Sequence, residues 1–216
     1  MKDTRKKILR TAARLFAQKG FSGTSVRDII TTAGVNVSAI NYYFGDKRGL
    51  YKETLLHLAQ EHHNQVWGKN VSTPTIKEIE SYSREQALSL LHRIFDRLLE
   101  HSLSHNNLPL ERIFTRVELE SAPMRKMLLS YVEPLHELPY KLLSKVTGLP
   151  ENSPTLVVVS HSIFSQIMLS ECHRLVILNK LGIKHIPPVL RQQIKKIVWQ
   201  NTLAILNSYK KGIKKN

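Results

Sequence analysis

Apolar residues recur at helical spacing along almost the whole chain, and this pattern leaves little room for any element other than helices. Between residues 4 and 19, for example, Ile8, Ala12, Leu15 and Phe16 fall on one face of a helix. No run combines period-two alternation with the turn residues of a hairpin. Hydrophobic residues make up 42% of the chain, which is enough to build a packed core. The sequence therefore predicts an all-α protein.

Capping residues divide the first 67 residues into four helices. Thr24 or Ser25 can cap the second helix, Asn36 the third and Asp46 the fourth. Gly34 separates the second helix from the third. The expected helices are residues 4–19, 26–33, 37–44 and 47–67. Two short helices joined by a glycine-containing turn have the form of a helix-turn-helix motif.

The remainder of the chain predicts longer helices after a connection at residues 68–82. These helices are expected at 84–105, 110–119, 123–147, 154–180 and from Pro188 onward. Pro134 and Pro139 are expected to kink or split the helix at 123–147. Residues 157–159, three valines, would alone fit a strand, but the Ser153-Pro154 cap before them and the length after them favour a helix. We therefore expect a three-helix domain at residues 1–50, joined by a fourth helix to a larger helical domain within 51–216.

The chain carries a strong positive charge, much of it near its N-terminus. The formal net charge of the 216 residues is +15. Residues 1–52 hold eleven Lys or Arg against three Asp, a net of +8. A chain this basic usually meets a polyanion, which is either nucleic acid or an anionic membrane surface.

Other features of the composition indicate the compartment. A single cysteine, Cys172, excludes a disulfide framework within the chain. The first residues contain no apolar signal core. The most apolar stretch, residues 156–178, holds too many Ser, His, Gln, Glu and Arg side chains for a membrane span. We expect a cytoplasmic protein with no membrane segment.

The predicted helix at residues 37–44 has one side that is too polar to be simply buried. Ile40, Tyr43 and Phe44 can face a core. The residues left facing outward are Val37, Ser38, Asn41 and Tyr42. Asn can pair with adenine through two hydrogen bonds, a small Ser allows close approach to base edges, and Tyr offers a hydroxyl to phosphate and a ring to a thymine methyl. These side chains predict a helix that reads the major groove of DNA.

Groups suited to phosphate flank this helix. Thr24 and Ser25 lie at one predicted helix N-terminus and Lys47 at another, where amide groups and the helix dipole favour an anion. Arg27 and Arg48 fit surface ion pairs better than base readout. Alternatives remain for two of the outward-facing residues, since Ser38 can be a simple helix-start residue and Asn41 a solvated one.

Several segments together resemble the N-terminal domain of TetR/AcrR-family regulators. They are Ile8–Phe16 (ILRTAARLF), Gly20-Phe21, Thr24–Ile29 (TSVRDI), Ala33–Val35 and Tyr43–Tyr51 (YFGDKRGLY). The resemblance implies that Thr24, Val37, Ser38, Asn41, Tyr42 and Lys47 stand at positions that commonly touch DNA, and that Tyr43 and Phe44 are a structural pair. Two positions depart from the family pattern, because many members have a basic residue at Val37 and Tyr at Asn41. The resemblance implies a repressor of a palindromic operator whose sequence cannot be transferred.

The second half of the chain looks similar to the C-terminal domain of CecR-type members of the same family. The similarity rests on residues 112–182, with Glu133-Pro134-Leu135-His136, Thr147-Gly148 and Ser160-His161. It implies a helical domain that dimerises and senses an effector. The apolar faces of the last two long helices also predict a homodimer with a four-helix interface, although the same faces could be intrachain core. The predicted interface residues are Ile163, Ile167, Ser170, Ile194, Ile197, Val198 and Ile205.

A regulator of this kind needs an input, which we expect to be a small molecule held within the second domain. The candidate pocket residues are Phe95, Leu98, Phe114, Arg116, Glu118, His136, Tyr140, His161, Phe164 and Met168. Each of them could equally be a core or surface residue. Arg116 and Glu118 are the most informative if they are buried, because a buried charge requires a partner.

Two further classes of protein compete with a specific regulator. An enzyme is disfavoured, because the ten histidines form no metal-protease, P-loop or nucleophile-elbow pattern. We expect no catalytic residue, no resident metal and no cofactor, although a metal-sensing regulator is an alternative. The second class is a basic protein that binds DNA or a membrane surface without sequence preference, and the compact helix-turn-helix pattern argues against it.

Overall fold

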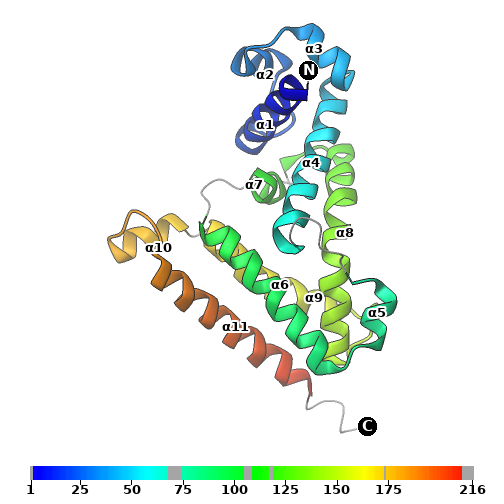
Figure 1. The fold of residues 1–216 in the computed structure, drawn as a ribbon, viewed down its shortest axis with the longest axis vertical. Helices are drawn as coiled ribbons and strands as arrows, with labels where there is room; N and C mark the ends of the chain where they lie inside the picture. Colours follow the sequence, from blue (N-terminus) through cyan, green and yellow to red (C-terminus); the bar gives the residue numbers. More distant parts are fainter. Residues whose placement is uncertain (1, 68–73, 105–108, 117–118, 173, 211–216) are drawn as a thin grey trace. The chain divides into compact units, whose positions relative to one another are not determined.

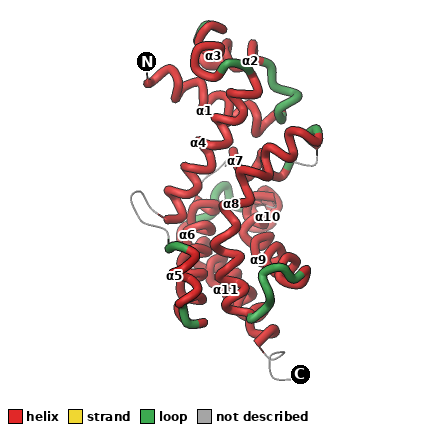
Figure 2. Tube along the Cα trace, turned by 90° about the vertical axis from the view of Figure 1, so that its right-hand side faces the viewer, coloured by secondary structure: helices red, strands yellow, loops and turns green. Residues whose placement is uncertain are grey.

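The computed structural model of the protein describes residues 2–67, 74–104, 109–116, 119–172 and 174–210. Its helices, shown in Figure 1, are α1 (Lys2–Lys19), α2 (Val26–Ala33), α3 (Val37–Phe44), α4 (Lys47–Trp67), α5 (Ile76–Ser81), α6 (Arg84–Ser104), α7 (Pro109–Thr115), α8 (Ala122–Thr147), α9 (Pro154–Cys172), α10 (Arg174–Leu181) and α11 (Pro188–Lys210). Figure 2 shows that every regular element in these ranges is a helix. The all-α prediction is confirmed.

The chain forms two compact units. Unit 1 consists of residues 1–64 and 107–135, and unit 2 of residues 65–106 and 136–216. Unit 1 is larger than the segment 1–50 expected from the sequence, because it also holds α7 and the first part of α8. Helix α8 contributes residues to both units.

Local capping explains why the first helices begin where they do. Ser25 and Asp28 form a capping box at the start of α2, in which each side chain accepts a hydrogen bond of 3.0 Å from the backbone N–H of the other. The Asn36 side chain accepts one from the Ser38 N–H at the start of α3. Asp46 Oδ1 accepts one from the Gly49 N–H at 2.7 Å in the first turn of α4. These helices then bury one face each in the core of unit 1.

The core of unit 1 joins α1 to the three helices that follow it. Ile8, Leu50 and Leu55 are fully buried, and Phe16 is 1% exposed. The Phe16 ring meets the Tyr51 ring edge-on, with 4.8 Å between the ring centroids. Burial of such side chains stabilises each by about 1.5–3 kcal/mol, which is more than the local propensity of short helices supplies.

Unit 2 is built from α6, α9, α11 and the second part of α8, with α5 and α10 beside them. One sequence expectation was wrong here. The connection at 68–82 contains α5, which a capping box between Thr75 and Glu78 starts. The range expected for one helix, 154–180, is helical in all of its described residues, as α9 and α10, and α10 buries none of its side chains. Helix α8 continues through Pro134 and Pro139, so of the two expected effects of these prolines, a kink or a split, the split does not occur.

Ion pairs join α6 to α11 within unit 2. Lys195 Nζ lies 2.7 Å from Asp96 Oδ1 and 3.2 Å from Glu100 Oε2. Arg191 lies 3.0 Å from the other oxygen of Glu100. The two carboxylates thus neutralise two cations between α6 and α11.

Within the residues that the structure describes, no helix is long and apolar enough to cross a membrane.

Glu100→Gln is expected to lower stability slightly at neutral pH and to flatten its acid dependence. The hydrogen bond from Ser104 is the main cause that lowers the pKa of Glu100; burial opposes it, and Lys195 and Arg191 act in the same direction as Ser104. Because the folded-state pKa is lowered, the stabilisation is present above the ordinary pKa and is lost as the pH falls through the lowered one. The side chain is 42% exposed, so the effect is only a few tenths of a kcal/mol, about what a surface pair gives. Urea unfolding at several values between pH 7 and pH 3 would measure it, and an unchanged acid slope in the variant would contradict it.

Candidate nucleic-acid interface

Helix α3 separates a buried face from an exposed one. Ile40 is fully buried and Phe44 is 8% exposed, so these two residues anchor the helix in the core of unit 1. On the other side Val37 is 46% exposed and Tyr42 is 71% exposed. Ser38 and Asn41 are also exposed. The structure therefore brings the four predicted base-reading side chains together on one solvent-facing surface, which we call the α3 face.

The helices around α3 hold this surface in place. Helix α2 packs against both α1 and α3. The C-terminal end of α3 is followed directly by α4, and the Tyr43 ring lies next to those of Tyr42 and Phe44, with centroids 4.9 and 6.0 Å away. The Arg5 guanidinium lies 5.6 Å above the Phe44 ring and pairs with Glu53 at 2.6 Å. The first turn of α1 is thus tied to both α3 and α4.

Ser25 and Lys47 lie at the helix N-termini where the sequence places them. Ser25 is exposed at the start of α2. Lys47 is the first residue of α4, and its Nζ lies 4.3 Å from the centroid of the Phe21 ring. Burial lowers the pKa of Lys47, and the charge of Glu120 acts in the opposite direction. The aromatic ring holds the ammonium group at the N-terminus of α4, where the helix dipole also favours an anion.

Thr24 does not join this surface. It is only 1% exposed, and its hydroxyl donates to the Gly20 carbonyl at 2.8 Å and the Leu15 carbonyl at 3.2 Å. The side chain therefore satisfies carbonyl groups at the end of α1 and is not available to a phosphate in this structure. Of the seven predicted DNA-contacting residues, six remain accessible in whole or in part.

Four of the predicted effector residues form one stack of rings in unit 2. Phe95 on α6 lies 5.6 Å from Phe164 on α9, measured between ring centroids. Phe164 stacks on His136 of α8 at 5.3 Å, and His136 meets His161 edge-on at 6.5 Å. Burial first, and then the neighbouring His161, lower the pKa of His136. Both effects favour the neutral form of His136, and the rings meet where α6, α8 and α9 come together.

The other predicted effector residues are more scattered. Leu98 and Tyr140 are half-buried in unit 2, whereas Arg116 belongs to unit 1. Glu118 and the side chains of Phe114 and Met168 lie outside the described residues. Arg116 belongs to unit 1 and the ring stack to unit 2, and the role of the ten candidates as effector residues stays a prediction.

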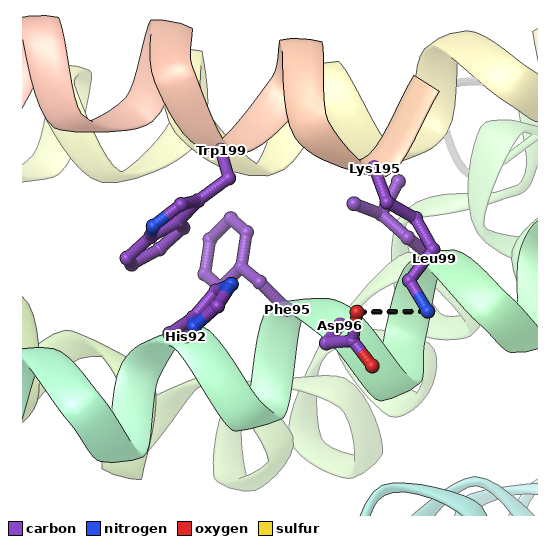
Figure 3. A pocket seen from close by; sticks show the side chains of 6 residues that line it. All are labelled: His92, Phe95, Asp96, Leu99, Lys195 and Trp199. Atoms are coloured by element: carbon purple, nitrogen blue, oxygen red, sulfur yellow. Dashed lines mark ion pairs between the residues drawn. The ribbon is translucent and has the colours of Figure 1, made fainter. Parts of the chain in front are cut away.

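A small pocket opens between α6 and α11, shown in Figure 3. It is lined by His92, Phe95, Asp96, Leu99, Lys195 and Trp199. Trp199 stacks on His92 with 4.2 Å between the ring centroids. Only Phe95 was among the predicted residues, although positions 92, 95, 96 and 99 share one helical face and could have been found by their spacing. Because Asp96 and Glu100 neutralise Lys195, the pocket suits an apolar group better than an anion.

The predicted dimer residues divide into buried and exposed sets. Ile163, Ile167 and Val198 are at most 6% exposed and belong to the core of unit 2, so they are not free to form an interface. Ile194 and Ile205 are partly buried against the same core. Ile197 is 55% exposed. The side chain of Ser170 lies outside the described residues.

Exposed apolar side chains that the sequence analysis did not select lie on the same helices. Val157 is 42% exposed and Val158 67% exposed on α9, and Val189 is 73% exposed on α11. The alternative interpretation of the two apolar faces as intrachain core thus holds for three of the seven predicted positions.

Among the described residues, no group of three or more His, Cys, Asp or Glu side chains could hold a metal ion.

Models of known protein families match both halves of the chain. Residues 8–54 match the family described as bacterial regulatory proteins, tetR family, and residues 87–209 match the C-terminal domain of the HTH-type transcriptional dual regulator CecR. The "Probable HTH-type transcriptional regulator YttP" of Bacillus subtilis (strain 168) is 38% identical over 131 residues, which are 60% of this chain and 58% of YttP. The match therefore spans less than two thirds of YttP.

Two more distant proteins match over a greater share of their length. CecR of Shigella flexneri is 22% identical over 181 residues, which are 83% of this chain and 81% of CecR. The crystal structure of AibR in complex with isovaleryl coenzyme A and operator DNA has the same fold, with a TM-score of 0.62, 14% identity, and coverage of 90% of this chain and 96% of AibR. The family model of the CecR C-terminal domain covers more than half of the chain. The chain therefore belongs to the TetR/AcrR family of transcriptional regulators, with a CecR-type C-terminal domain.

Proposed function

We propose that the chain is a cytoplasmic repressor that binds a palindromic operator as a homodimer and leaves it when a small molecule binds within unit 2. The observation that carries this proposal is the α3 face. Val37, Ser38, Asn41 and Tyr42 are exposed together while Ile40 and Phe44 anchor the same helix. An exposed face with a bidentate amide, a small hydroxyl and a large ring suits base edges better than it suits bulk water.

Dimerisation follows from the size of the α3 face. One helix of eight residues reads only a few base pairs, and two copies that share a two-fold axis add their binding free energies. Val158, Val189 and Ile197 are exposed apolar residues on α9 and α11 and supply a surface that a second copy would cover. The dimerising helices are therefore α9 and α11, and the second copy contacts their exposed faces rather than their buried ones.

The effector site proposed here is the ring stack of Phe95, Phe164, His136 and His161. The AibR crystal structure is a complex with both isovaleryl coenzyme A and operator DNA, which supports a ligand-responsive mechanism for this fold. In this chain, a ligand that inserts between the rings would separate α8 from α9 or α6. A coupling of about 1–3 kcal/mol is enough to release an operator.

Binding to DNA from upstream of the protein's own gene, compared with scrambled DNA at two salt concentrations, tests the proposal. Because the operator could lie elsewhere in the genome, the same measurement is made with duplexes that the protein selects from a pool of random sequences. A preference of about a thousandfold or more, with a two-fold symmetric footprint, is the expected result. Equal and salt-steep binding to every duplex would instead favour a basic protein that binds DNA or a membrane surface without sequence preference.

Lys47→Ala is expected to lower affinity for operator and scrambled DNA by the same factor. The ammonium group at the N-terminus of α4 is proposed to neutralise a phosphate, and a phosphate contact carries no sequence information. The slope of log affinity against log salt should flatten by roughly one unit for each bound subunit. Lys52→Ala, an equal change of charge at an exposed site farther along α4, is the control. A loss confined to the operator, with an unchanged slope, would contradict this role.

A further inference from the structure

Glu120 has a buried carboxylate that lies against the turn after the C-terminal end of α1. It is 8% exposed, and its Oε1 accepts a hydrogen bond of 2.7 Å from the backbone N–H of Phe21. A desolvated carboxylate beside the negative end of a helix dipole is unfavourable on both counts. Its other oxygen, Oε2, is buried without a hydrogen-bond partner among the described residues. The charge-assisted bond to Phe21 and the attraction of the Lys47 ammonium stabilise the carboxylate at this place.

The turn after α1 is shaped to admit this carboxylate. Gly20 ends α1 with a φ of +74°, a conformation that other residues rarely adopt. A Cβ atom at Gly20 would lie 2.7 Å from Glu120 Oε1, closer than two such atoms approach. The absence of a side chain at Gly20 thus lets the Glu120 carboxylate reach the next N–H of the chain.

Phe21 connects this contact to the start of α4. The Phe21 ring meets the Tyr51 ring at 5.1 Å and lies below the Lys47 ammonium at 4.3 Å. Burial first, and then the charge of Glu120, raise the pKa of the Tyr51 hydroxyl. Glu120 therefore holds the backbone of Phe21, while the Phe21 ring packs against the first two turns of α4.

Glu120 also stands at the start of the helix that enters unit 2. It lies two residues before α8, which extends from Ala122 to Thr147 and carries His136 and Tyr140. Helix α7, just before it in the chain, packs against α1. The first residue of α8 thus lies only two positions along the chain from the residue whose carboxylate holds the turn between α1 and α2.

We propose that Glu120 is a positioning residue that fixes the turn between α1 and α2, so that the position of α8 sets the operator affinity of the α3 face. This inference rests on the proposed function and adds the residue through which regulation would reach it. The relevant quantity is the ratio of operator affinity to scrambled-DNA affinity, because that ratio depends on how α3 is presented and not on net charge.

Three variants of the full-length protein separate the hydrogen bond from the charge. Glu120→Ala removes both, Glu120→Gln removes the charge but keeps an acceptor for the Phe21 N–H, and Glu133→Ala removes a charge from an exposed site on α8. All are compared at a temperature where unfolding curves show them fully folded. Glu120→Ala is expected to lower the affinity ratio about tenfold or more, while Glu120→Gln and Glu133→Ala stay within about threefold of the wild type.

Amide hydrogen exchange in the same proteins provides a readout that does not depend on DNA. The Phe21 amide should exchange about tenfold faster or more in Glu120→Ala than in the wild type, and Glu120→Gln should restore most of the protection. Unchanged exchange, or a Gln variant as impaired as the Ala variant, would overturn the inference. If the wild type discriminates between the DNAs and Glu120→Ala discriminates equally well, the inference fails while the proposed function stands. If the wild type does not discriminate, the proposed function itself fails, and the role of Glu120 in operator affinity fails with it.

Discussion

Tyr42→Ala is expected to weaken operator binding by about 1–3 kcal/mol for each bound subunit, or about 2–6 kcal/mol for a dimer, which is a loss of roughly thirtyfold or more. Tyr42 is 71% exposed at the centre of the α3 face, and the Tyr43 ring meets it edge-on at 4.9 Å. That contact fixes the direction of the side chain before DNA arrives, so little rotamer entropy is lost on binding. Affinity for operator and for scrambled DNA would be measured by titration at one salt concentration.

Stability should hardly change in the same variant, because Tyr42 takes little part in the core. We expect the free energy of unfolding to fall by less than about 1 kcal/mol, mainly through the lost ring contact with Tyr43. Tyr42→Phe keeps the ring and removes the hydroxyl, so it separates packing against a base methyl from a phosphate hydrogen bond. Leu56→Ala, at an exposed apolar site on α4, is the control for a general effect on DNA binding of truncating an exposed side chain. Operator affinity equal to that of the wild type would show that α3 is not the recognition helix.

The helices of the N-terminal region could be predicted to within a residue or two because their ends are set locally. Ser25 and Asn36 each cap a helix through a bond to an N–H group two or three residues away. Such signals do not depend on the rest of the fold. The starts of α2, α3 and α4 consequently agree with the predicted ones, and the α3 face follows from the period of the helix alone.

The packing partners of an apolar face could not be predicted in the same way. Periodicity shows that Ile163 and Val198 lie on apolar faces, but it does not show whether the same chain or a second copy covers them. In the structure the core of unit 2 covers both. Thr24 is a related case, because the sequence shows a hydroxyl near a helix start and cannot show that it donates to the carbonyl groups of Leu15 in α1 and of Gly20 just after it.

Glu120 gave no signal in the sequence at all. The hydrogen bond that holds it joins residues 99 positions apart, and no cap, spacing or motif marks a single acidic residue before a helix. Arg116 and Glu118 of the same segment were predicted as candidate effector residues, and Glu118 lies outside the described residues. Only the fold shows that the charge of Glu120 is buried against the turn after α1.

Gly49→Ala is expected to destabilise unit 1 and to abolish most of the specific DNA binding. A Cβ atom at Gly49 would lie 2.0 Å from the carbonyl oxygen of Phe44 and 3.2 Å from its carbonyl carbon. Both atoms belong to the backbone at the C-terminal end of α3, so no side-chain rotation can relieve the clash. The end of α3 must move away from the first turn of α4, at a cost of about 1–3 kcal/mol.

DNA binding should weaken even in the fully folded variant, because the α3 face and Lys47 at the start of α4 are displaced relative to one another. Phosphate contacts from one helix and base contacts from the other then no longer fit one duplex, and a misplacement of about 1 Å is enough to weaken both. We expect at least tenfold weaker operator binding at a temperature where the variant is fully folded. Denaturant unfolding and operator titration together would separate the two effects.

Gly182→Ala supplies the matched control in unit 2. A Cβ atom there would meet nothing within 4 Å, but the φ of +65° makes any side chain unfavourable by about 1–2 kcal/mol. The two variants should thus lose similar amounts of stability for different reasons, and only Gly49→Ala should lose operator affinity in its folded state. If both variants bound the operator as tightly as the wild type, the close approach of α3 and α4 would not be what orients the recognition surface.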